Sequence, residues 1–169
     1  MSVEKNFVEL IFKKTNMDKG FKATMKQVDN EAFEWKFWYV LNSFVCRLEN
    51  RDIRKAFAVI GSSIAKSTQI CNGSVGLGRA IAMTLRDSSE KVYPPRLMKL
   101  LSIDDSEELL DFLRPTLSFL SSKGIQLDYS SVLSDVIAYI GDEDKREAVK
   151  VHWVSDFLSN GQEAKDVSE

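Results

Sequence analysis

The organisation of this chain depends on the stretch Gly73-Ser74-Val75-Gly76-Leu77-Gly78-Arg79-Ala80, a glycine-rich turn between two segments of helical pattern. Three glycines within six residues allow backbone conformations and close approaches that other residues do not. The stretch lacks the Lys-Ser or Lys-Thr pair of a phosphate-binding P-loop, and the segment before it, residues 54–67, is helical in pattern, whereas a dinucleotide fingerprint needs a strand there. The glycines therefore predict helix–helix packing in preference to ligand binding.

On the N-terminal side of the turn, apolar residues recur at helical spacing. Asn50 is suited to cap a helix that runs to about residue 67, with one apolar face made of Ile53, Phe57, Ile60 and Ile64. Two shorter helices are expected earlier, over residues 4–14 and, capped by Asp18, through residue 27. The aromatic-rich residues 33–48 hold Phe37, Leu41, Phe44 and Val45 at helical spacing, which favours buried core over a surface that stacks nucleobases.

On the C-terminal side, five further helices are expected. They cover residues 77–85, a short segment opened by Pro94 and Pro95, residues 104–122 with an acidic start and a kink or break at Pro115, residues 129–140 capped by Asp128, and residues 142–158. Gly124 is expected to end the third of these. The sequence thus predicts an all-α, single-domain bundle of about eight helices over residues 1–161, followed by a flexible C-terminal tail over residues 162–169.

Composition limits the class of protein and its compartment. The 169 residues are 44% hydrophobic and 28% charged, as in a soluble globular domain, and no apolar run is long enough to span a bilayer. Cys46 and Cys71 form no short motif, which favours a reduced, cytoplasmic location. Residues 1–100 hold 17 Lys+Arg and 10 Asp+Glu, a charge of +7, whereas residues 101–169 hold 6 and 15, a charge of −9. This asymmetry is typical of a polyanion-binding face with an acidic back, or of head-to-tail pairing, although a solvated surface would also give it.

Catalytic chemistry is difficult to build from these residues. His152 is the single histidine, so a zinc site based on several histidines is excluded. Ser155 and Asp156 are its helical neighbours, but a triad also needs an oxyanion hole and a nucleophile held apart from its base. The acidic residues at 104–108 could bind Mg²⁺, but capping and charge matching at a helix start explain them more simply. We therefore expect no enzyme activity and no cofactor or metal.

The basic residues give a clearer functional pattern than the candidate catalytic residues do. Arg47, Arg51, Arg54 and Lys55 lie along one helical surface if the chain continues as helix past Asn50, and Arg51 stands at a helix start, where phosphate groups bind well. On this pattern, we expect Arg51, Arg54 and Lys55 to lie outside the core. A solvated outer face is the alternative interpretation.

A wider pattern surrounds these residues. The run Gly76-Leu77-Gly78-Arg79-Ala80-Ile81-Ala82 is followed, after a gap, by Arg96-Leu97-Met98-Lys99-Leu100-Leu101. Lys26 comes early, Arg51 precedes the helix that leads to the glycine turn, and Gly141 begins a charged link to a final apolar helix. These features, with the helix order over about residues 20–158, resemble the CasB small subunit of the type I-E CRISPR Cascade complex.

The resemblance implies a groove of basic side chains that holds nucleic-acid backbone, at positions that are here Lys26, Arg51, Arg114, Lys145 and Arg146. The chain departs from the family pattern at Gln27 and Leu113, where a second basic residue is expected, and acidic residues flank Lys145 and Arg146. Arg47, Arg54 and Lys55 are alternative carriers of the same role. Arg79 belongs to the family signature and is a further candidate, although at a helix start it could equally bind neighbouring carbonyl groups.

The function implied by the resemblance is that of a non-catalytic Cascade subunit in antiviral defence. Such a subunit pairs head to tail with a second copy of itself and contacts other Cascade subunits. It holds the crRNA-paired target DNA and the displaced DNA strand, and so stabilises the R-loop. Two other interpretations stay open on the sequence: a helical protein–protein adaptor without a nucleic-acid role, favoured by the overall acidity, and a nucleotide-binding enzyme built on the glycine turn.

Overall fold

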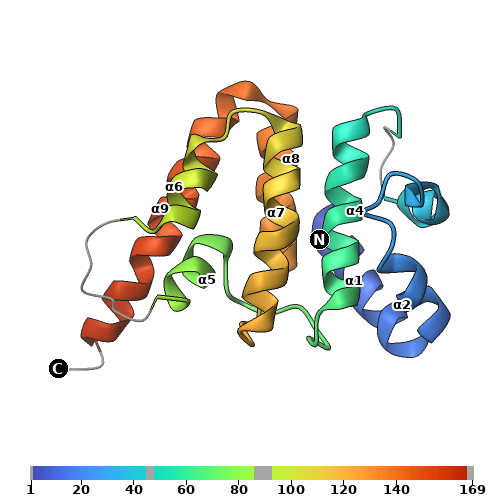
Figure 1. The fold of residues 1–169 in the computed structure, drawn as a ribbon, viewed down its shortest axis with the longest axis horizontal. Coiled ribbons are helices and arrows are strands. Elements are labelled where there is room, and N and C mark those ends of the chain that lie inside the picture. The colour runs from blue at the N-terminus through green and yellow to red at the C-terminus, as the bar shows by residue number, and fades with distance from the viewer. Residues whose placement is uncertain (1, 45–47, 86–92, 167–169) are drawn as a thin grey trace.

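The computed structural model describes residues 2–44, 48–85 and 93–166 (Figure 1). Its helices, in chain order, are α1 (Val3–Met17), α2 (Lys19–Met25), the 3-10 helix η1 (Glu34–Phe37), α3 (Trp38–Leu41), α4 (Arg51–Lys66), α5 (Leu77–Met83), α6 (Pro95–Ser102), α7 (Ser106–Ser122), α8 (Tyr129–Gly141) and α9 (Glu143–Asp166). The described residues contain no strand, only an isolated bridge between Val75 and Leu127. The predicted all-α fold is confirmed.

Side-chain caps fix where several helices begin. The carboxylate or amide oxygens of Asp18, Asn50, Asp105 and Asp128 each accept a backbone N–H three residues later, at 2.9–3.1 Å. These bonds satisfy donors that the first turn of a helix otherwise leaves unpaired. The caps predicted at Asp18, Asn50 and Asp128 are confirmed.

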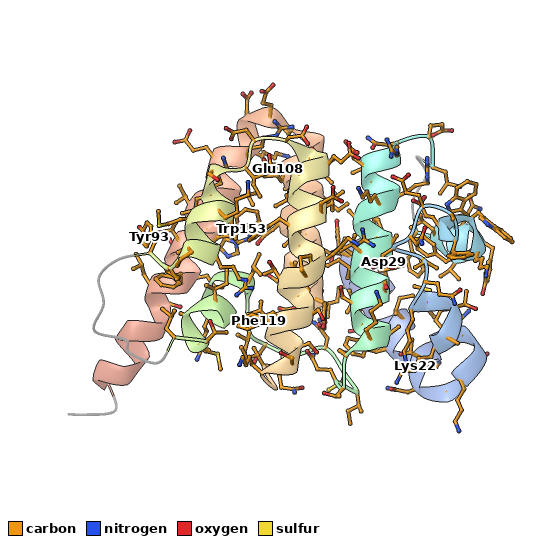
Figure 2. All side chains as sticks on the ribbon, viewed as in Figure 1. Lys22, Asp29, Tyr93, Glu108, Phe119 and Trp153 are labelled. Atoms are coloured by element: carbon orange, nitrogen blue, oxygen red, sulfur yellow. The ribbon has the colours of Figure 1, made fainter. Side chains whose placement is uncertain are left out.

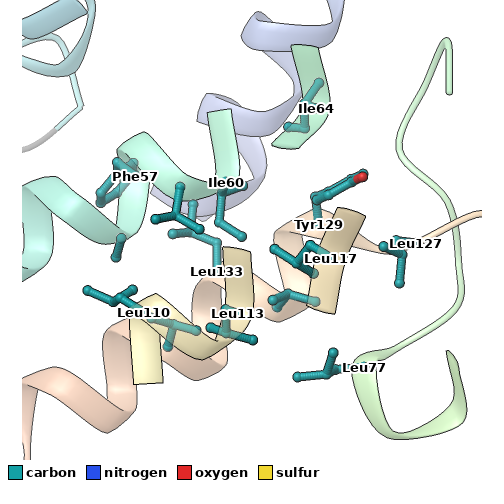
Figure 3. Close-up of a cluster of buried hydrophobic side chains, with 14 of the residues drawn as sticks. Phe57, Ile60, Ile64, Leu77, Leu110, Leu113, Leu117, Leu127, Tyr129 and Leu133 are labelled. Atoms are coloured by element: carbon teal, nitrogen blue, oxygen red, sulfur yellow. The ribbon is translucent and has the colours of Figure 1, made fainter. Parts of the chain in front are cut away.

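The core lies where α4, α7 and α8 meet. Helices α4 and α7 run side by side in the same direction, with α8 packed against α4 (Figure 1). Figure 3 shows the buried side chains that these helices contribute, among them Phe57, Ile60 and Ile64 from α4, Leu110, Leu113 and Leu117 from α7, and Tyr129 and Leu133 from α8. Each such side chain stabilises the fold by about 1.5–3 kcal/mol when it leaves water, so this cluster holds α4 and α7 in a fixed relation.

The glycine turn brings backbones into contact. A Cβ atom on Gly73 would lie 2.0 Å from the carbonyl oxygen of Gln126, and one on Gly78 would lie 2.0 Å from the carbonyl oxygen of Trp153 in α9. One N–H group in the first turn of α5 meets a protein carboxylate: the backbone N–H of Arg79 donates to Asp156 Oδ2 at 2.8 Å. The turn therefore serves helix packing, as predicted, and the start of α5 is occupied by an internal anion.

Three local predictions differ from the structure. Helix α7 runs unbroken through Pro115, because Pro115 and Asp111 are exposed and water can replace the lost backbone hydrogen bond. Helix α9 continues to Asp166, past the expected end at residue 158 and into the segment expected to be a tail. The aromatic residues 33–44 form η1, α3 and turns instead of one helix, and residues 45–47 lie outside the described chain.

Candidate nucleic-acid interface

The first half of the seam between α4 and α7 is closed by ion pairs. Arg51 pairs with Glu31, and also lies 3.9 Å from Glu107. Lys55 Nζ lies 3.0 Å from Asp111 Oδ1 and 3.8 Å from Glu107 Oε1. The hydrogen bond from Arg51 to Glu31, with the charges of Glu31 and Glu107, raises the pKa of Arg51 above its ordinary value. We call these five residues the closed half of the seam.

The prediction that Lys55 lies outside the core is wrong. Its side chain is only 8% exposed, because the aliphatic stem is covered and the ammonium group reaches Asp111 across the seam. Arg54 is also largely covered. Its Nε donates to Glu34 Oε1 at 2.9 Å, its Nη1 donates to the carbonyl of Leu48, and its guanidinium lies 5.3 Å from the centre of the Trp38 ring. Arg54 therefore anchors η1 and α3 to α4.

The predicted basic surface of Arg47, Arg51, Arg54 and Lys55 is not formed as one helical face. Asn50 has an extended backbone and begins a new helix, so the chain is not helical across it. Arg54 faces η1 and α3, whereas Arg51 and Lys55 face α7. Arg47 lies outside the described residues.

The second half of the seam opens into a cleft of 440 Å³. Two cations reach its floor, where Lys66 Nζ lies 3.0 Å and Arg114 Nε 3.4 Å from Asp29 Oδ2. Asp29 lies beside α4 (Figure 2). Hydroxyl groups complete the lining, from Ser63, Ser67, Thr68, Ser118, Ser121 and Ser122. We call this hollow the serine cleft.

The serine cleft offers two cations, one shared carboxylate and several hydrogen-bond donors. Among the described residues, the hydroxyls of Ser63 and Ser118 make no hydrogen bond to a protein acceptor, so they are available to a ligand. Burial raises the pKa of Tyr129, which lies next to Ser67 and Ser121, to about 12, so this phenol stays neutral and does not repel an anion. Such a donor set suits the oxygens of a phosphodiester, since arginine, lysine and serine side chains are among the groups that contact phosphates in nucleic-acid complexes.

Sequence reasoning found Arg114 but missed Lys66 and the serines. Lys66 follows Lys55 by three helical turns, and Ser118, Ser121 and Ser122 are spaced at i, i+3 and i+4, so periodicity places each set on one face. Lys26 lies close to the same region, because its carbonyl accepts a hydrogen bond from Ser62 of α4 at 3.1 Å, next to Ser63. The Lys26 side chain is exposed.

The other predicted basic residues lie elsewhere. Arg146 is a structural residue that donates to the carbonyls of Tyr139 at 3.2 Å and Asp104 at 2.7 Å, and it covers the Tyr139 ring. Lys145 is exposed and lies 4.0 Å from Asp142. Arg79 is half-buried in α5, which packs on α9. Arg146 therefore sits beside the start of α7, whereas the serine cleft lies along its second half.

The residues considered for catalysis have structural partners. Asp135 Oδ2 accepts from Trp153 Nε1 and lies against His152 Nδ1, both at 3.1 Å, and burial raises the pKa of Asp135 although His152 opposes the shift. Asp156 bonds to α5 rather than to His152.

The acidic residues in the range 104–108 also have structural roles. Asp104 pairs with Lys150, whose hydrogen bond holds the pKa of Asp104 below its ordinary value, while Asp105 caps α7. Within the described chain, no group of three or more His, Cys, Asp or Glu side chains is placed to hold a metal ion. None of the described helices is long and apolar enough to cross a membrane.

Comparison with known proteins identifies the family. The family model of CRISPR-associated protein Cse2 matches residues 22–158 of the 169. Comparisons with curated proteins and with solved structures gave no match. The matched region contains η1 and every helix from α3 to α8, most of α2 and α9, and both halves of the α4–α7 seam. The chain therefore belongs to the Cse2 family, the CasB small subunits of the type I-E CRISPR Cascade complex.

Proposed function

We propose that this Cascade subunit holds the crRNA-paired target strand and the displaced DNA strand by their phosphates, and that the serine cleft is its principal contact. The observation that carries the proposal is the meeting of Lys66 and Arg114 in a hollow lined by serine hydroxyls. These groups bind a phosphate without reading a base. Sequence specificity is then left to pairing with the guide RNA, and the subunit acts without catalysis by stabilising the R-loop.

Asp29 fits this role as a placeholder. It neutralises part of the charge of Lys66 and Arg114 and keeps both side chains at the cleft when no strand is bound. A phosphate that enters the cleft would compete with Asp29 for the same donors. Lys26, beside the cleft, is proposed as a further contact, whereas Arg51 and Lys145 are not, because acidic neighbours already partner them.

The charge asymmetry supports a second element of the proposal, the pairing of two copies. The basic residues 1–100 of one copy are complementary to the acidic residues 101–169 of the next, which favours a head-to-tail arrangement beside the other Cascade subunits. Such pairing should weaken as salt concentration rises, because screening acts on exposed charges. Sedimentation of the purified chain across a salt series would measure it.

The proposal is tested by the salt dependence of single-stranded DNA binding. Each phosphate contact contributes about 0.7 to the slope of log K against log salt, so Lys66→Gln/Arg114→Gln should reduce the slope by about 1.4. The matched control is Lys5→Gln/Lys13→Gln, which removes the same charge from exposed positions on α1. If the control lowers the slope as much as the cleft variant does, the serine cleft is not the contact. If wild-type protein binds no DNA in the assembled complex, the adaptor interpretation is favoured.

A further inference from the structure

A set of aromatic rings is exposed beside α2. Of the rings in residues 33–39, Phe37 is buried, whereas Phe33, Trp35, Trp38 and Tyr39 are exposed, with Trp35 at 59% and Tyr39 at 66%. The sequence predicted that Phe37 and Leu41 of this segment face the core, and both are buried, while the rings two residues on either side of Phe37 point outward. We call Trp35 and Tyr39 the aromatic shelf.

The shelf is held in place by the protein. Trp35 Nε1 donates to the carbonyl of Ala32 at 3.2 Å, so the single polar group of this indole is already used and the exposed part offers only its ring. In the described chain, neither Trp35 nor Tyr39 stacks on another aromatic ring. The Trp35 ring is therefore oriented, and neither shelf ring is covered by another aromatic ring of the described chain, as expected of a surface that receives another planar group.

A groove of 470 Å³ separates the shelf from α2. Its lining includes Phe21 and Lys36 as well as both shelf residues. The ammonium group of Lys14 lies 5.3 Å from the centre of the Phe21 ring. The one acidic lining residue, Asp18, is engaged as the cap of α2, where it accepts from the N–H of Phe21 at 3.1 Å. The groove thus combines flat apolar faces with cations.

Helix α2, which lines the groove, also carries lysines and ends close to the serine cleft. Lys19, Lys22 and Lys26 follow one another at helical spacing, and none of them forms an ion pair with another described residue; Figure 2 labels Lys22. The carbonyl of Lys26 bonds to Ser62, next to the cleft. These lysines add positive charge to the face of α2 opposite Gly20, Phe21 and Thr24, which line the groove.

From these observations we infer that the aromatic shelf is a stacking site for unpaired bases of single-stranded DNA, a role that rests on the proposed function. A stacked base is held by its ring face, so all four bases are accepted. The positive charge favours this occupant over a protein partner. A protein that covered the shelf would also bury Lys36 and crowd Lys14, and buried cations without acidic partners cost free energy, whereas DNA brings a negative charge with each base.

The test compares two oligonucleotides that differ only in their bases. The full chain, alone and in the assembled complex, is titrated with oligothymidylate and with an abasic strand of the same length and charge. The wild type should bind the strand with bases at least about fivefold more tightly. Trp35→Leu/Tyr39→Leu should lose this preference and keep the salt slope, whereas Trp35→Phe/Tyr39→Phe, which keeps the rings, should retain most of it. Circular dichroism checks that all variants are folded.

The possible outcomes test the aromatic shelf and the serine cleft independently of each other. If the leucine variant keeps the wild-type preference for bases, or the wild type has none, the stacking site is wrong even when the cleft stands. If the leucine variant binds both strands normally but fails to enter the complex or to pair with a second copy, the shelf is a protein-docking surface. Lys66→Gln/Arg114→Gln should weaken binding of both strands equally and leave the preference intact. If it binds as wild type while the preference persists, the cleft fails and the shelf stands.

Discussion

The two halves of the α4–α7 seam use similar residues to opposite effect. In the closed half, Arg51 and Lys55 face three carboxylates, those of Glu31, Glu107 and Asp111. In the serine cleft, Lys66 and Arg114 face a single carboxylate, that of Asp29. The closed half therefore links the two helices and carries an excess of negative charge. The serine cleft is a hollow with an excess of positive charge. A basic residue on a helix identifies neither role; the acidic residues that other segments place around it decide which applies.

The largest expected difference between the halves is in folding stability. Lys55→Glu would place a carboxylate against Asp111 and Glu107 at a position that is almost fully buried. We expect it to lower the free energy of unfolding by about 2–4 kcal/mol, less than the cost of a fully buried broken pair because Asp111 is half-exposed. Lys66→Glu, at a side chain that is 48% exposed, should cost under about 1 kcal/mol. Urea unfolding of both variants measures the contrast, and equal losses would mean that Lys55 is no cross-link.

Next in size is the contribution of the hydroxyl groups in the cleft. Ser63→Ala/Ser118→Ala removes two donors that are free of protein partners among the described residues. Each lost hydrogen bond to a strand should cost about 0.5–1.5 kcal/mol of binding free energy. The salt slope should not change, because no charge is removed. Ser134→Ala, on the exposed side of α8, is the control. Wild-type affinity in the double variant would show that the strand does not enter the cleft.

Much of the fold could be predicted because its signals are local. A cap such as Asn50 or Asp128 acts three residues away, and the apolar face of α4 repeats within the helix itself. The glycine turn was assigned to packing because the residues that phosphate-binding loops require are missing. The break that was allowed at Pro115 is absent, because the cost of a proline depends on whether the freed carbonyl meets water, and exposure is a tertiary property.

The candidate site depended on distant residues and was predicted only in part. Lys55 pairs with Asp111, 56 residues further along the chain, and Arg114 pairs with Asp29, 85 residues away in sequence. Helical spacing describes one helix at a time, so it could not separate the cross-link from the cleft. The aromatic segment was predicted in part: Phe37 and Leu41 are buried as expected, but the segment forms η1, α3 and turns and not one helix.

A smaller effect should follow from removing the carboxylate that the cleft cations share. Asp29→Asn frees Lys66 and Arg114 to bind a strand, so single-stranded DNA should bind more tightly and the salt slope should steepen by up to about 0.7, the value of one phosphate contact. Glu107→Gln makes the same change of charge in the closed half, where Asp111 and Glu31 still hold the cations. It should leave DNA binding nearly unchanged. A tighter complex with both variants would indicate a general charge effect instead of a local one.

The smallest effect is expected at Arg51. At this residue the structure and the family resemblance lead to opposite predictions about DNA binding. The resemblance assigns this residue to the nucleic-acid groove, but here Arg51 pairs with Glu31 and lies near Glu107. Its side chain is 58% exposed, and exposed pairs contribute little to stability, so Arg51→Gln should not measurably change the midpoint of unfolding. Because both acidic neighbours would have to be displaced before a phosphate could bind, the variant should also keep the wild-type salt slope, while Arg114→Gln lowers it. If Arg51→Gln flattens the slope as much as Arg114→Gln does, the bound strand displaces Glu31 and Glu107, and the interface extends along the whole α4–α7 seam.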